Sequence, residues 1–353
     1  VSLDRASERG ADGRPASALR RQSDVVHAAI AVDLTKPSKY PRAGISDIHP
    51  RRARFDVALT LRSHRPQART LAFELDPWHE LELVSDESGA PLVFLRDHVG
   101  GRSAGIDDQL WDNSVIVLLP EPIGAGERVL RFVYEAEILN YVSGRAWYPG
   151  EEEAHADPHT AELVLTALPK HELRAMGREI ESRDEQGRRF RRYAIERPAR
   201  MVTFTFAEKF EEQRLDVEGG PTIAAFSARA GGRAKAFNVA ADVANAWSFF
   251  ERWLGRGPAS STVYATSIVG HHGQAFDGFL HLAESSWETE SRGPTELFRA
   301  HEVAHAWWGH LVGWRSYRDQ WLSESFAEYS AMRFVEAAVP DGAARYAEMV
   351  ETM

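Results

Sequence analysis

The stretch HEVAHAWWGH, residues 301–310, places two histidines four positions apart around a glutamate in an apolar run. Residues four apart on an α-helix differ by about 40° around the axis and by about one turn in height, so His301 and His305 can direct two imidazoles at one metal ion. Glu302 lies about 100° round the helix axis from His301, where it can reach a water molecule bound to that ion. The alternative is a buried helix with hydrogen-bonded core histidines, and the flanking alanine and tryptophans fit it equally well.

A third ligand would distinguish these interpretations, because catalytic zinc uses three protein ligands and keeps one position open. Eighteen residues separate His305 from Glu324, which stands near the start of a second helical segment, residues 320–340. The first helix is expected to begin at Pro294 and to end near Gly309 or Gly313, so an antiparallel helix pair would bring Glu324 beside the histidines. Alone, this residue would more simply be a surface acid in a first helical turn. The spacing favours a zinc ligand.

HEVAHAWWGHLV and WLSESFA, at this spacing, resemble the motifs HELAHQWFGNLV and WLNEGFA of a known family. It comprises the gluzincin zinc metallopeptidases related to membrane alanyl aminopeptidase (aminopeptidase N) and leukotriene hydrolase. The resemblance implies one zinc ion per chain, held by His301, His305 and Glu324, with Glu302 as the general base of a hydrolase that cleaves peptide substrates. Glu328, one turn beyond Glu324, would either support the metal shell or face solvent.

The order of elements fits the fold that this resemblance implies. Residues 1–24 are polar and predict a flexible lead-in, whereas residues 25–215 alternate between polar and apolar positions as β-strands do. Residues 216–353 mix strand-like runs with helical ones, including an amphipathic helix over 233–255 that ends on a glycine. The resemblance implies a multidomain chain, in which a β-rich, sandwich-like N-terminal saddle domain precedes a thermolysin-like α+β catalytic domain that is incomplete at its C-terminal side.

One motif of the family departs from its usual form. Aminopeptidases of this family carry a GxMEN strand whose glutamate holds the free α-amine of the substrate. Aligning GFLHLAE of this chain with the GLITYRE of the family places Ala275 at that glutamate, so we expect the amine anchor to be missing. Gly278 and Phe279, on the following strand, are the implied substrate-binding residues. The alternative anchors are Asp277, more simply a turn residue, and Glu284.

Two further features are left open by the sequence. His271 and His272 suggest a second metal site, but adjacent histidines in a glycine-rich loop are usually solvated. The family's transition-state tyrosine lies some sixty residues past the third zinc ligand, and we expect it beyond residue 353.

Composition excludes several other functions. The 353 residues include 42 basic and 52 acidic ones, and no Lys/Arg run is long enough to bind nucleic acid. The absence of cysteine excludes disulfides and thiol nucleophiles, so a metal must be held by His, Asp or Glu. No apolar run approaches the ~18 residues of a membrane span. Because the sequence begins with Val1, we expect a longer parent protein. A membrane association of that parent is not visible in this sequence, because the basic residues of the lead-in are interleaved with acidic ones and favour a solvated linker over contact with a membrane surface.

These features leave more than one function open. The first is zinc-dependent peptide hydrolysis of an aminopeptidase-like kind. The alternatives are a noncatalytic zinc-binding scaffold and an endopeptidase-like relative without an amine anchor. Retention of Glu302 favours an enzyme, because a structural zinc site has no need of a base.

Overall fold

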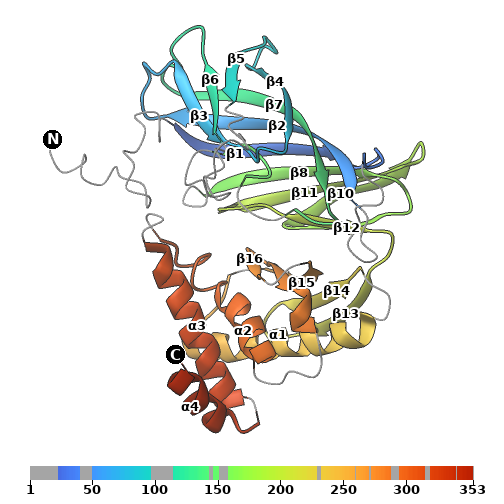
Figure 1. Ribbon diagram of the computed structural model, residues 1–353, viewed down its shortest axis with the longest axis vertical. Helices are drawn as coiled ribbons and strands as arrows, with labels where there is room; N and C mark the ends of the chain where they lie inside the picture. The colour runs from blue at the N-terminus through green and yellow to red at the C-terminus, as the bar shows by residue number, and fades with distance from the viewer. Residues whose placement is uncertain are drawn as a thin grey trace, which may run out of the picture.

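A computed structural model describes most of the chain. The described residues are 23–39, 50–96, 114–142, 146–150, 158–228, 232–258, 260–269, 272–287, 294–314, 319–338 and 340–352. Almost all of the predicted lead-in, and His271, lie outside them. In Figure 1 a β-rich part lies above a part that combines a sheet with helices.

The β-rich part contains three sheets built from twelve strands of the described chain. The largest has the order β10-β11-β8-β1-β2-β7-β4, and the smaller ones have the orders β3-β6-β5 and β12-β9. The strands are β1 (Ser23–Asp33), β2 (Arg51–Ser63), β3 (Thr70–Glu74), β4 (Glu80–Ser85), β5 (Val93–Arg96), β6 (Ser114–Leu118), β7 (Glu127–Ile138), β8 (His159–Ala167), β9 (Glu172–Ala175), β10 (Arg178–Glu185), β11 (Arg188–Ala199) and β12 (Phe204–Ala207).

Alternation along the strands separates a core face from a polar face. On β2, Phe55, Val57, Leu59 and Leu61 are fully buried, whereas the residues between them are only partly covered. A strand turns successive side chains to opposite faces, so this period of two places one row in the core. The β-strands predicted from alternation are therefore present in this region.

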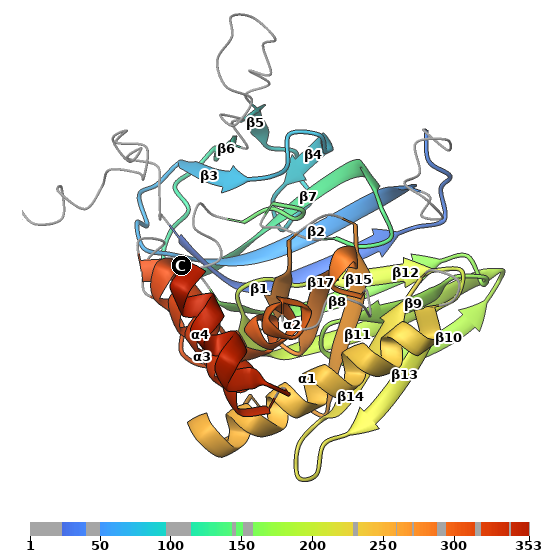
Figure 2. The same ribbon diagram turned by 60° about the horizontal axis from the view of Figure 1, so that its bottom comes forward.

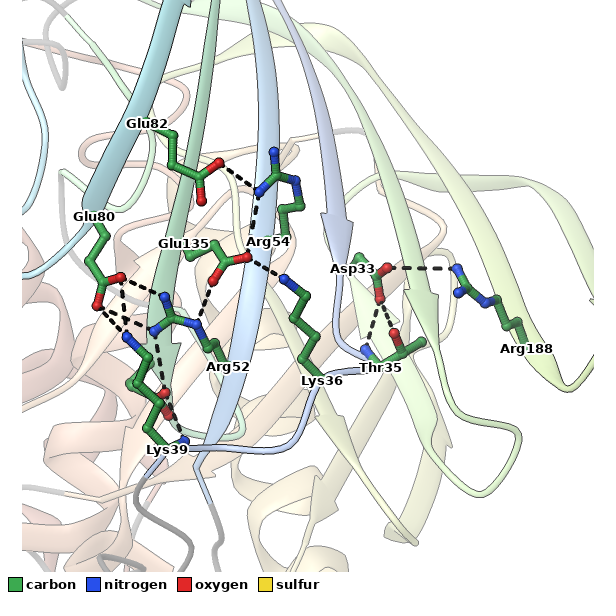
Figure 3. Close-up of polar contacts among 11 residues, drawn as sticks. Asp33, Thr35, Lys36, Lys39, Arg52, Arg54, Glu80, Glu82, Glu135 and Arg188 are labelled. Atoms are coloured by element: carbon green, nitrogen blue, oxygen red, sulfur yellow. Dashed lines mark hydrogen bonds and ion pairs between the residues drawn. The ribbon is translucent and has the colours of Figure 1, made fainter.

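The polar face carries a network of charges across β2, β7 and β4 (Figure 3). Arg52 lies between two carboxylates, with Nη2 2.6 Å from Glu80 Oε2 and Nε 2.5 Å from Glu135 Oε2. Lys36 also pairs with Glu135. The hydrogen bond from Arg52 lowers the pKa of Glu80 to about 2. The Arg52–Glu135 pair is largely shielded from solvent, so removing either partner would cost more stability than it would in an exposed pair.

The second part combines a five-stranded sheet with helices. The sheet has the order β13-β14-β15-β17-β16, with β14, β15 and β17 parallel and both edge strands antiparallel to their neighbours. The elements are β13 (Glu211–Asp216), β14 (Thr222–Ser227), α1 (Gly232–Leu254), β15 (Thr262–Ile268), β16 (Gln274–Phe276), β17 (Phe279–Ala283), the 3₁₀ turn η3 (Glu284–Trp287), α2 (Pro294–Ala304), α3 (Gln320–Ala338) and α4 (Gly342–Thr352).

Helix α1 follows the predicted pattern closely. Its buried residues recur at helical spacing, and they are Ala236, Val239, Ala240, Val243, Ala246, Trp247 and Phe250. The helix ends where Gly255 adopts a φ of +92° and donates its N–H to the carbonyl of Glu251. Such a left-handed residue after the last turn is the usual glycine stop signal.

Helix α2 begins at Pro294 as predicted, but it ends at Ala304, earlier than the expected stop near Gly309. After Ala304 the chain tightens, because Trp307 N–H bonds to the carbonyl three residues back rather than four. His305 nevertheless keeps its helical hydrogen bond to the carbonyl of His301, at 3.3 Å. Both histidines therefore remain on one helical face.

Apolar residues cover both faces of the five-stranded sheet. Phe226 and Phe279 pack into the core of the β-rich part, whereas Ile223 and Leu280 pack under the helices. Figure 2 shows α1, α2 and α3 on the side of this sheet away from the large one. The sheet is thus a middle layer, and the boundary at residues 215/216 stays a prediction.

None of the described helices is long and apolar enough to cross a membrane.

Candidate metal centre and catalytic site

Helices α2 and α3 bring three metal-binding side chains together. The Nε2 atoms of His301 and His305 are 3.0 Å apart, and Glu324 Oε2 lies 3.3 Å from the first and 3.4 Å from the second. Ligands of a tetrahedral zinc ion at 2.0–2.1 Å are separated by roughly 3.3 Å, so the three atoms fit zinc coordination. Among the described residues, this is the one group of three such side chains close enough to hold a metal.

The other ring nitrogen of each histidine is held by a hydrogen bond. His301 Nδ1 donates to Glu328 Oε2 at 2.8 Å, and His305 Nδ1 donates to the carbonyl of Trp308 at 2.9 Å. These bonds fix the rings so that both Nε2 atoms face Glu324, which is how metal-binding histidines are usually oriented. Glu328 was expected either to support the metal-binding residues or to face solvent, and its hydrogen bond to His301 places it beside the metal-binding residues.

The charges around the three side chains favour a cation. Burial opposes protonation of His301, but the hydrogen-bonded carboxylates of Glu324 and Glu328 outweigh it and raise the pKa of His301 to about 10. Hydrogen bonds from His301 and His305 hold the pKa of Glu324 well below its usual range. Because a metal ion binds the neutral imidazole, protons and metal compete for these groups and metal binding would release a proton.

Glu302, at the next position on α2, lines a cavity that His301, His305 and Glu324 also line. It is 5% exposed, and burial raises its pKa above that of a solvated carboxyl, which suits a group that accepts a proton near neutral pH. A Cβ atom on Gly273 would lie 2.0 Å from Glu302 Oε1. The backbone before β16 thus packs directly on the carboxylate, and a side chain at position 273 would displace it.

A cavity of about 160 Å³ joins these groups to the edge strand β16. Ala275 lines it, and its carbonyl accepts a 3.1 Å hydrogen bond from His310 Nε2. Burial lowers the pKa of His310 to about 4, so the ring is neutral near pH 7. Phe279 is fully buried against Phe226, and Gly278 forms the β16–β17 turn with a φ of +73°. The structure places neither of these two residues at the cavity.

The alternative amine anchors also lie away from the cavity. Asp277 pairs with Arg197 of β11, whose Nε is 2.9 Å from Asp277 Oδ2. Glu284 belongs to the 3₁₀ turn after β17. His272 lines a different cavity, together with Asp76 and His79.

Other cavity residues were not found by sequence reasoning. Arg200, from the loop between β11 and β12, and Trp314, from the loop after α2, both line the cavity. Arg200 lies about a hundred positions before Glu302, so only tertiary structure brings the two together. His310 lies within the quoted motif, but nothing in its spacing indicates a bond to Ala275.

Comparison with known proteins bears on the same region. Residues 279–353 match the model of the peptidase family M1 domain. A 53-residue segment is 40% identical to the puromycin-sensitive aminopeptidase of Caenorhabditis elegans, and covers 15% of this chain and 6% of that protein. Over these residues the chain is similar to the M1 peptidase family. The chain spans only a small share of the length of this relative.

Solved structures of M1 enzymes share the fold. The M1 zinc metallopeptidase from Deinococcus radiodurans superposes with a TM-score of 0.67 at 17% identity, over 94% of this chain and 75% of that one. A variant of that enzyme bound to a Tyr-Ser-Ala substrate gives the same TM-score at 18% identity and the same coverage. At this low sequence identity, the similarity to these structures is one of fold alone. The family match and the zinc metallopeptidases among these structures indicate zinc as the metal.

Proposed function

We propose that this chain is a member of the M1 peptidase family and hydrolyses peptide bonds with the help of one zinc ion. The observation that carries the proposal is the separation of three ligand atoms by 3.0–3.4 Å, with buried Glu302 lining the same cavity. His301, His305 and Glu324 would hold the ion. Bound there, zinc would polarise a carbonyl and lower the pKa of a coordinated water.

The residues of this chain would perform the proton transfers. Glu302 would accept a proton from the attacking water and then deliver it to the leaving nitrogen. Gly273 keeps the Glu302 carboxylate in place, because its backbone packs against Oε1. Glu328 and the carbonyl of Trp308 would keep the imidazole rings of His301 and His305 oriented toward the metal.

A peptide substrate fits the surroundings of the cavity. Strand β16 is the edge strand of the five-stranded sheet beside the cavity, and edge strands bind extended peptides through main-chain hydrogen bonds. The bound tripeptide in a structural relative supports peptides as the substrate class. We include in this proposal an aminopeptidase-like activity and the division into a saddle-like domain of residues 25–215 and a catalytic domain from residue 216.

The alanine at position 275 predicts weak selection for a free N-terminus. The measurement is the ratio of kcat/KM for one peptide with its amine free to that for the acetylated form. This ratio should be ten- to a hundredfold smaller than in an M1 aminopeptidase that has the anchor glutamate. The physical reason is that a charge-assisted hydrogen bond contributes ~1.5–3 kcal/mol. Ala275→Glu offers the matched variant and should restore selection. A strong preference for the free amine in the unmodified protein would show that another carboxylate serves as the anchor.

Ala275 also supports a second candidate, a zinc-binding protein without peptidase activity. The same assays separate the two functions. Bound zinc without turnover of either the free or the acetylated peptide would favour the scaffold, whereas turnover of acetylated peptides would favour an endopeptidase-like enzyme.

A further inference from the structure

Arg200 places a positive charge in the wall of the cavity that holds Glu302 and the zinc-ligand side chains. Its side chain is 9% exposed, and its guanidinium carbon lies 4.2 Å over the ring of Trp314. Nη2 also donates to the carbonyl of Trp314 at 3.3 Å. A Cβ on Gly313 would lie 1.8 Å from Nη2, so this glycine makes room for the guanidinium. Stacking and close packing thus fix the orientation of the charged group.

The balance of charge in the cavity favours an anionic ligand. Among the described residues that line it, the carboxylates are Glu302 and Glu324, and the proposed mechanism uses one as the base and the other as a zinc ligand. Ala275 contributes no charge where the family has its ammonium-binding glutamate. Arg200 is the charged lining residue that these two roles leave over, and its guanidinium would attract a carboxylate and repel an ammonium.

We propose that Arg200 is a specificity-determining residue that binds a carboxylate of the substrate. This inference rests on the proposed function and names its substrate class, which is peptides that carry a carboxylate near the scissile bond. A guanidinium presents N–H donors in a planar fork that matches a carboxylate, and such charge-assisted bonds are strong where water is excluded. Burial lowers the pKa of Arg200, as expected for a guanidinium that is partly removed from water.

The carboxylate has two sources, an acidic side chain or the C-terminus of a short peptide. Four N-acetylated dipeptides separate them, with Glu or Gln first, Ala second, and a free or amidated C-terminus. Their dissociation constants are measured by calorimetry on the zinc-loaded Glu302→Gln protein, in which turnover is slow. We expect at least one of the two matched comparisons to favour the carboxylate by about ten- to a hundredfold.

Arg200 variants then assign the effect to this residue. Arg200→Gln should abolish the preference, and Arg200→Lys should retain part of it. Arg178→Gln is the matched control, because Arg178 is exposed on β10 and pairs with Glu196. That control should leave the preference unchanged. Equal affinities for all four peptides in the parent Glu302→Gln protein, or an unchanged preference in Arg200→Gln, would overturn the inference.

Failure of this inference is distinguishable from failure of the proposed function. Hydrolysis of peptides by zinc-loaded protein without any preference for a carboxylate would refute the role of Arg200 and leave the peptidase intact. An Arg200-dependent preference in the Glu302→Gln protein, together with no hydrolysis of peptides by the zinc-loaded unmodified protein, would support carboxylate binding and refute the peptidase. The peptide comparison does not require any Arg200 variant to fold.

Discussion

Replacement of Glu302 by glutamine should lower the turnover of a peptide substrate by ~10²-fold or more, the usual effect of losing a positioned proton-transfer group. The substitution keeps the shape of a side chain that is 5% exposed and in close contact with Gly273. It removes the basicity and leaves the three zinc ligands in place. Zinc content and melting temperature should therefore stay nearly unchanged while kcat falls. The measurements are steady-state kinetics, metal analysis and thermal denaturation of the same preparation.

Glu296→Gln is a suitable control, because Glu296 lies in the first turn of the same helix. It changes the charge of α2 by the same amount but does not line the cavity. Its kinetics should be close to those of the unmodified protein. A near-normal rate for Glu302→Gln would exclude Glu302 from the mechanism.

Arg299→Met should lower the free energy of unfolding by about 3–5 kcal/mol, which is the typical cost of removing one member of a buried ion pair. Arg299 is 4% exposed; it pairs with Asp242 of α1 and donates to the carbonyl of Ser286. Burial already raises the pKa of Asp242, and the pairing with Arg299 opposes this. Loss of the guanidinium would leave the partly buried carboxylate of Asp242 and the carbonyl of Ser286 without this partner, at the position where α2 packs against α1.

Urea denaturation in the presence of a chelator measures this effect apart from any contribution of zinc. Arg333→Met is the matched control, because Arg333 is 40% exposed on α3 and should contribute less than about 1 kcal/mol. The double variant Arg299→Met/Asp242→Asn should regain part of the lost stability, since it removes the stranded charge as well. A loss below about 1 kcal/mol in the single variant would contradict a structural role for the pair.

The parts of the fold that depend on local pattern could be predicted from the sequence. Alternation in β2 and helical spacing in α1 each reflect one face turned to a core, so the residues themselves carry the signal. The proximity of His301, His305 and Glu324 also followed from spacing, because one helix carries the pair and a short connection returns the chain. The family match covers this same stretch.

The parts that depend on long-range packing could not be predicted. Arg200 reaches the cavity from the β-rich part, and the close contact between Gly273 and Glu302 arises only when β16 lies against α2. The resemblance that placed Ala275 at the position of the family's amine-binding glutamate also implied Phe279 for substrate binding, but this side chain packs in the core of the β-rich part. Strand residues alternate between faces, and sequence alone did not show that both faces of this sheet are buried.

The metal content of the purified protein tests the central claim most directly. After growth in zinc-sufficient medium, we expect close to one zinc ion per chain, and His301→Ala should lose most of it, because the substitution removes one of three ligands. Circular dichroism would show whether the variant is still folded. Zinc far below one per chain in the unmodified protein, or an unchanged zinc content in a folded His301→Ala variant, would contradict the account.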